Sequence, residues 1–360
     1  MATPIANSLR SDSAVLPERL PVAPESGAAD REPWTKRLFT NVARRCKNNS
    51  FFFPAAVRGF RTLQKFGFNV TPNHFYWPVP DVAELERREW PIYAAPPGCN
   101  FRMREQVELV KNVSSHYVPE LNWSVTETPD CYHYQNGFFE CVDAEIAYCM
   151  VRHRKPRRII EIGSGYSTRV MAQALRANFE RDGVRGDLIT VDPYPERLPK
   201  DGLGDVVTVV PERVQRLDLS LFEMLGPDDI LFIDSSHVVA VGSDVVREYL
   251  QILPRLNPGV LVHVHDIFLP SDYPRSAVLE NLWFWSEQYL LQAFLTFNPE
   301  FEVLWSASAM QLSHAQLLEK SFPNWSNSYS NMPPAKRRFV PTIDGRRVWP
   351  SSFWMRRIPK

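Results

Sequence analysis

Hydrophobic positions in the central part of this chain form short continuous runs that alternate with stretches of helical spacing. The runs cover Arg158 to Ile162, Asp187 to Asp192, Asp205 to Val210, Asp229 to Asp234 and Gly259 to His265. Continuous apolar runs of this length are typical of strands covered on both faces. Helices are expected over 143–153, 169–179 and 243–253, where apolar residues recur with the helical period. The alternation predicts a parallel sheet flanked by helices.

Two further apolar segments extend the predicted sheet. A strand-like run from Phe301 to Met310 follows a long aromatic helix expected from Leu279 to Phe297. Near the C-terminus, Phe353 to Met355 are expected to supply an edge strand. The sheet then has seven strands and is mostly parallel. The sequence therefore predicts an α/β fold of the Rossmann-like, doubly wound type.

Composition divides the chain into four regions. Residues 1–33 are rich in Pro, Ala, Ser and charge and are expected to form a disordered leader, because they can bury little apolar surface. Residues 34–140 combine aromatic clusters with prolines and predict a helical or irregular N-terminal cap. Residues 141–312 carry the alternation of strands and helices, and residues 313–360 form a C-terminal extension that contains the edge strand.

Charge and cysteine content narrow the kinds of partner. Lys plus Arg and Asp plus Glu number 41 each, so the net charge favours neither nucleic acid nor a membrane surface. We expect a small-molecule partner, and a homo-oligomer stays open. Five cysteines without a C-x-x-C pair disfavour a disulfide framework and a zinc ribbon. The sequence shows no apolar signal segment or membrane span, so a cytoplasmic location is expected.

The richest motif begins where the first predicted strand ends. Residues 161–168 read Glu-Ile-Gly-Ser-Gly-Tyr-Ser-Thr, so Gly163 and Gly165 allow a sharp turn that a ligand can approach closely. A dinucleotide-binding turn would carry a third glycine, and Thr168 stands in its place. The Glu-x-Gly-x-Gly arrangement resembles motif I of the class I S-adenosylmethionine-dependent methyltransferases. A plain βα turn is the alternative interpretation.

Other segments carry the same resemblance. The second and fourth predicted strands end in Asp192 and Asp234, and a Pro258-Gly259 turn precedes the fifth. The runs 234–237 and 263–268, together with 71–76 and Phe353-Trp354, look like a bacterial group filed as methyltransferase domain 24. In all, the likeness covers roughly residues 60–357, and it identifies a fold and a cofactor far better than a substrate.

The resemblance implies S-adenosylmethionine as cofactor and assigns residues to it. Asp192 is expected to accept the two ribose hydroxyls, and the turn and the helix N-terminus after it are expected to hold the methionine part. The remaining cofactor candidates are Asp234 and Ser235. The turn residues assigned to the cofactor are Glu161, Gly163, Ser164, Gly165, Tyr166 and Ser167. Packing of Tyr166 on the sheet is an alternative that stays open. Two interpretations also stay open for Arg213 to Gln215, which either face the adenine or form a solvated loop.

Polar residues at two strand ends supply the candidate chemistry. A strand order of 3-2-1-4-5 would bring Asp234 and His237 beside His265 and Asp266. His265 is the first candidate for a general base, because the pKa of an unperturbed histidine lies near neutrality, and His237 is the second. Asp266 completes the catalytic set, whereas His263 lies deeper and is expected in the core.

A divalent cation such as Mg²⁺ is a further hypothesis for these strand ends. Asp234 and Asp266 offer the oxygen ligands that such a cation prefers, although Asp and His at strand ends are common without metal. His74 and Tyr76 are candidates for substrate contact from the N-terminal cap, with a proline-bounded turn as the alternative.

Three functions remain open at this point. The first is methyl transfer from S-adenosylmethionine to a small or medium acceptor, expected at oxygen. The second is an NAD-dependent oxidoreductase built on the same sheet, which the absent third glycine disfavours. The third is a nucleoside-binding or interaction module without catalysis, which would not require polar side chains at neighbouring strand ends.

Overall fold

The computed structural model describes residues 52–71, 77–90, 96–127, 131–199, 203–325, 342–343, 346–347 and 350–359. The chain divides into two compact units, Met1–Trp77 and Pro78–Lys360. The expected leader and both substrate candidates, His74 and Tyr76, lie outside the described residues. The first unit contains α2 (Phe52–Lys65), and the second contains the sheet.

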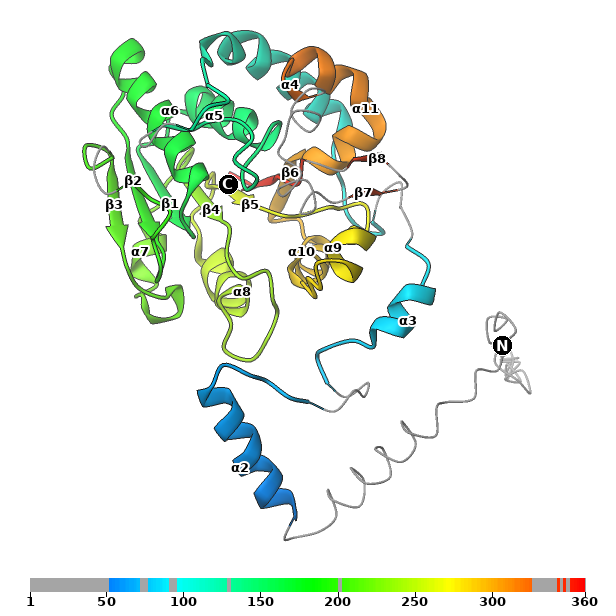
Figure 1. Ribbon diagram of the computed structural model, residues 1–360. Helices are drawn as coiled ribbons and strands as arrows, with labels where there is room; N and C mark the ends of the chain where they lie inside the picture. Colours follow the sequence, from blue (N-terminus) through cyan, green and yellow to red (C-terminus); the bar gives the residue numbers. More distant parts are fainter. Residues whose placement is uncertain are drawn as a thin grey trace, which may run out of the picture. The chain divides into compact units, whose positions relative to one another are not determined.

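A seven-stranded sheet forms the centre of the second unit, in the order β3-β2-β1-β4-β5-β9-β6 (Figure 1). Strands β1 to β5 pair in parallel, and β9 pairs antiparallel with both β5 and β6. The strands are β1 (Arg158–Ile162), β2 (Asp187–Val191), β3 (Val207–Val210), β4 (Ile230–Ile233), β5 (Leu261–Val264), β6 (Phe301–Ser306) and β9 (Phe353–Arg357). This topology confirms the predicted Rossmann-like, mostly parallel seven-stranded fold.

Alternation along the central strands builds a hydrophobic core on each face of the sheet. Ile159 and Phe232 belong to one core, while their neighbours Ile160 and Leu231 belong to the other. Because both faces are covered, the strands read as continuous apolar runs, which is why the sequence predicted them well.

Helices from separate parts of the chain cover the two faces (Figure 1). The first face packs against α4 (Met103–Tyr117), α5 (Asp143–Arg154), α6 (Tyr166–Asp182) and α11 (Ala307–Ser321). The second packs against η2 (Val214–Arg216), α7 (Ser220–Glu223), α8 (Asp244–Arg247), η3 (Glu248–Ile252), η4 (Leu253–Arg255) and α10 (Glu287–Leu295). The smaller elements are α3 (Val82–Arg87), η1 (Val118–Glu120), α9 (Arg275–Leu279), β7 (Thr342–Ile343) and β8 (Arg346–Arg347).

The expected long aromatic helix from Leu279 to Phe297 is wrong. Helix α9 ends at Leu279 and α10 begins at Glu287, with Leu282 between them in the left-handed region at φ 56°. In the intervening segment the chain turns toward the loop after β4, where the backbone amides of Ser286 and Glu287 donate to the carbonyl of His237. A continuous helix would have directed those amides along its own axis.

Two expectations at the C-terminal side also change. The strand expected over 301–310 ends at Ser306, whose side chain accepts from the amide of Ala309 and starts α11. Strand β9 is not at an edge, because it pairs with β5 on one side and with β6 on the other. Its residues Phe353, Trp354 and Met355 are fully buried, so the C-terminal segment completes the middle of the sheet.

Candidate functional site

A cavity of 760 Å³ opens at the carboxyl ends of the parallel strands. Residues that follow β1, β2, β4 and β5 line it, together with the loop from Gly137 to Glu140 and the side chains of Trp283 and Trp285. This edge is where ligands bind in open α/β sheets, since the strand order reverses direction between β1 and β4. The cavity therefore coincides with the edge where the sequence placed its candidate residues.

The turn between β1 and α6 has no room for a side chain at its first glycine. Gly163 has φ 94°, and a β-carbon there would lie 2.1 Å from the carbonyl oxygen of Asp234. The amide of Gly163 donates to the carbonyl of Val191, and the amide of Asp234 donates to that of Ile162, both at 2.9 Å. The turn is thus held between the ends of β2 and β4, and its backbone stays open toward the cavity.

Glu161 lies behind this turn and does not line the cavity. It is fully buried, and it accepts hydrogen bonds from the hydroxyls of Ser167 at 2.7 Å and Thr168 at 2.6 Å. Burial raises the pKa of this carboxyl to about 7, against the lowering effect of the hydroxyl donors. Thr168, which replaces the third glycine, also accepts from the amide of Gly165. Glu161 therefore positions the start of α6 and does not contact a ligand in the cavity.

The other cofactor candidates do line the cavity: Gly163, Ser164, Gly165, Tyr166, Ser167, Asp192, Asp234 and Ser235. Asp192 follows β2, and its carboxylate accepts from the hydroxyl of Ser164 at 2.5 Å and from the amide of Tyr194 at 2.7 Å. These bonds direct the carboxylate across the mouth of the turn. Arg213 to Gln215 border the same cavity.

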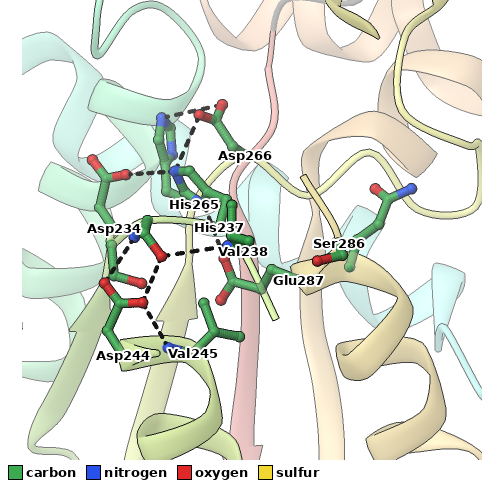
Figure 2. A network of polar contacts seen from close by, with 12 residues as sticks. Asp234, His237, Val238, Asp244, Val245, His265, Asp266, Ser286 and Glu287 are labelled. Carbon is green, nitrogen blue, oxygen red and sulfur yellow. Dashed lines mark hydrogen bonds and ion pairs between the residues drawn. The ribbon is translucent and has the colours of Figure 1, made fainter. Parts of the chain in front are cut away.

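A cluster of two carboxylates and an imidazole forms where β4 and β5 end (Figure 2). His237 Nε2 lies 3.3 Å from Asp234 Oδ1 and 3.6 Å from Asp266 Oδ2. One ligand atom from each residue falls within 4.8 Å of the other two. His237 and Asp266 both hold left-handed backbone conformations, at φ 59° and 56°, which are uncommon for residues with side chains. Such backbone strain is frequent at functional sites.

Glu287 supports this cluster from behind and was missed by sequence reasoning. Its Oε2 lies 2.8 Å from His237 Nδ1, and its side chain is fully buried (Figure 2). Burial lowers the pKa of His237, but the hydrogen bonds to Asp234 and Glu287 outweigh it and hold that pKa well above its ordinary value. The only signal in the sequence that could have pointed to Glu287 was its position as an acidic residue inside an aromatic, apolar segment.

The two remaining histidines behave differently. His265 is buried beside the cavity, with Nε2 3.8 Å from Asp266 Oδ1. Burial lowers the pKa of His265, but the charges of Asp266, Asp234 and Asp143 outweigh this effect and raise it. His263 stacks on Phe232 with ring centroids 3.8 Å apart and lies in the core, as expected. Burial holds the pKa of His263 well below its ordinary value.

The segment before β9 also reaches the site, which the sequence did not indicate. Ser351 lines the cavity and donates its hydroxyl to Asp266 Oδ1 at 2.9 Å. The amides of Ser351 and Ser352 donate to the buried carboxylate of Asp143, at 2.8 and 2.9 Å. The C-terminal segment therefore helps to fix the orientation of Asp266.

A methyltransferase-domain family model, methyltransferase domain 24, matches residues 160–267, from β1 to the residue after Asp266. These residues form a methyltransferase domain of the class I S-adenosylmethionine-dependent type. The match spans the glycine turn, Asp192 and both polar strand ends, and it decides against the NAD-dependent alternative. The cofactor of this methyltransferase is S-adenosylmethionine. The turn at Gly163, where only hydrogen fits in place of a side chain, leaves its backbone open to a cofactor in the cavity.

Several known proteins are similar to this methyltransferase. An uncharacterized protein of Archaeoglobus fulgidus is 31% identical over 180 residues, covering 47% of this chain and 79% of that protein. The Podospora anserina methyltransferase PaMTH1, solved with S-adenosylhomocysteine, is 18% identical over 62% of this chain and 87% of its own, with a TM-score of 0.34. The O-methyltransferase TomG of Streptomyces achromogenes, solved with S-adenosylmethionine, is 16% identical over 70% and 90%, with a TM-score of 0.31.

Proposed function

We propose that this methyltransferase transfers a methyl group to a hydroxyl oxygen of a small or medium acceptor beside a divalent cation. The observation that carries the proposal is the convergence of Asp234, His237 and Asp266 on one point next to the cofactor cradle. Two carboxylate oxygens and one imidazole nitrogen suit Mg²⁺ or Mn²⁺. Glu287 completes the arrangement, because a ligating histidine commonly pairs its other ring nitrogen with a carboxylate.

We assign a role to each group on the cofactor side of the cavity. S-adenosylmethionine supplies a methyl group on a sulfonium leaving group, so the protein mainly aligns the reactants and excludes water. We assign the methionine carboxylate to the amides at the start of α6, with the hydroxyls of Ser164 and Ser167 beside them. Asp192 would accept the ribose hydroxyls, and Ser235, which follows β4, lines the same cavity.

On the acceptor side, aromatic groups form the walls. Trp285 contacts His237 with ring centroids 4.6 Å apart and stacks on Trp283 at 4.5 Å, and Phe139 lies 5.1 Å from His265. A cation at the cluster would lower the pKa of an acceptor hydroxyl. His265 is our candidate to accept that proton, because it borders the cavity directly beside Asp266. Ser351 would hold Asp266 in place.

The cation is tested by replacing its ligands without changing their shape. We expect Asp234→Asn and Asp266→Asn each to weaken Mn²⁺ binding at least about tenfold. Calorimetry in the presence of S-adenosylhomocysteine measures this affinity. Both substitutions should also abolish methyl transfer to every member of a panel of hydroxylated acceptors. Asp244→Asn is the matched control, since Asp244 lines the same cavity outside the ligand set. Methyl transfer that survives both substitutions and an excess of chelator would contradict the cation.

A further inference from the structure

Helix α2 separates basic and apolar side chains onto two sides. Arg58, Arg61 and Lys65 are spaced i, i+3 and i+7 and so share one side, while Phe60 and Leu63 lie on the other. All three basic side chains are exposed. The apolar side is poorly covered too, since Leu63 is 39% exposed. A helix divided in this way, with its apolar side left partly exposed, is suited to a boundary between water and an apolar phase.

The chain just after α2 adds uncovered aromatic surface. Phe66 and Phe68 are 72% and 63% exposed, and Val70 is 63% exposed. Apolar side chains this exposed in succession mark an interaction surface when they adjoin the apolar side of an amphipathic helix. We call α2 together with residues 66–70 the basic aromatic segment.

Local charge indicates what this segment contacts. Between Glu32 and Asp81 the sequence contains no acidic residue, and five more basic residues, Lys36, Arg37, Arg44, Arg45 and Lys47, precede α2. Since the whole chain is balanced at 41 of each sign, its remaining residues carry an excess of acidic groups. The neutral total therefore conceals a basic region, and the expectation of no membrane partner had relied on that total.

We propose that the basic aromatic segment binds the surface of a bilayer containing anionic lipid. Phe60, Leu63, Phe66 and Phe68 would enter the boundary between headgroups and acyl chains, while Arg58, Arg61 and Lys65 face the phosphates. Along the described parts of the chain, every helix is too short or too polar to cross a bilayer, so the contact is interfacial. Double-stranded nucleic acid would contact the basic side alone and leave the phenylalanines and Leu63 in water, and a single strand would stack on the rings but leave Leu63 uncovered.

The proposal is tested with the full chain and sedimented vesicles. We expect binding to phosphatidylcholine vesicles that contain phosphatidylglycerol, little binding to phosphatidylcholine alone, and weaker binding as salt is raised. The triple variant Arg58→Gln, Arg61→Gln, Lys65→Gln should bind roughly a hundredfold less tightly. Arg104→Gln, Lys111→Gln, Arg185→Gln is the matched control, because it removes the same charge from exposed positions elsewhere and should bind like the wild type.

A second variant tests the apolar side. Phe60→Ala with Leu63→Ala keeps a high helix propensity but removes apolar surface, so we expect vesicle binding to fall at least about tenfold. S-adenosylhomocysteine should raise the thermal unfolding temperature by the same amount in every variant as in the wild type. That result would show that the sheet unit is intact. The proposal would be overturned by an absence of binding to anionic vesicles or by equal binding to neutral ones. It would also be overturned if the chain bound nucleic acid more tightly than vesicles, or self-associated through Phe60 and Leu63 instead of binding vesicles. None of these outcomes depends on the acceptor or the cation.

Discussion

His237 shows how single residues at this site are held by contacts from several elements. Its Nε2 faces Asp234 and Asp266, and its Nδ1 faces Glu287. Its carbonyl accepts from the amides of Ser286 and Glu287, so the backbone and the ring are fixed by the same neighbouring segment. A residue held on both sides in the left-handed region keeps its ring in one orientation, which is what a ligand to a cation requires.

Asp192 gives a direct test of the cofactor assignment. We expect Asp192→Ala to weaken S-adenosylhomocysteine binding roughly a hundredfold, because two hydrogen bonds to a charged acceptor are lost. Isothermal titration calorimetry measures the affinity. Asp187→Ala is the control, since Asp187 is exposed at the opposite end of β2. Unchanged affinity in Asp192→Ala would remove Asp192 from the site.

Glu161 predicts a pH dependence of folding stability. Its pKa is raised from 4.5 to about 7 in the folded chain by burial, so its contribution is fully present below pH 4.5 and is lost as pH rises through about 7. Glu161→Gln lacks this ionisation. We expect the unfolding free energy of the wild type, relative to the variant, to fall by roughly 3 kcal/mol between pH 4.5 and 7 and then to level off. Urea unfolding across that range measures it, and a constant difference would contradict the burial of an ionisable Glu161.

At the scale of elements, the turn from β1 to α6 and the ends of β4 and β5 form one unit. Gly163 packs directly against the backbone of Asp234, so the turn proposed to hold the cofactor and the cluster proposed to hold the cation share a contact. Displacing one must therefore displace the other.

A pair of glycine substitutions separates this contact from the general cost of a left-handed backbone. Gly163 and Gly183 both have positive φ, but a β-carbon at Gly183 meets nothing within 4 Å. We expect Gly183→Ala to cost roughly 1–2 kcal/mol of unfolding free energy and Gly163→Ala clearly more, with loss of S-adenosylhomocysteine binding in Gly163→Ala alone. Urea unfolding measures the loss of unfolding free energy, and calorimetry measures the loss of S-adenosylhomocysteine affinity. Equal losses of both quantities in the two variants would show that the Gly163–Asp234 contact is unimportant.

The sequence predicted these elements where local pattern decides the structure. The strands β1 to β5 could be recognised because burial on both faces makes them continuously apolar, and their polar ends then meet at one edge. The break between α9 and α10 depends on the backbone amides of Ser286 and Glu287, which donate to the carbonyl of the distant residue His237. Helical spacing in the sequence does not reveal this contact, so the predicted helix ran on through the break. Glu287 and Ser351 carry no local motif, and only the three-dimensional structure brings them to the site.

At the scale of the sheet unit, the C-terminal segment completes both the fold and the site. Strand β9 fills the place between β5 and β6, and Ser351 just before it reaches Asp266. A strand pattern in sequence does not reveal its neighbours, which is why β9 was expected at an edge. Because β9 pairs with β5 inside the sheet, Ser351 reaches Asp266 only when this strand is in place.

The most direct measurement is a crystal structure of the chain with S-adenosylhomocysteine and Mn²⁺. We expect the ligand in the cavity, with its methionine part along the turn from Gly163 to Ser167 and its ribose at Asp192. We also expect an anomalous peak among Asp234, His237 and Asp266. A cavity that stays empty at saturating S-adenosylhomocysteine, or a ligand bound away from the Gly163 turn, would contradict the proposed site.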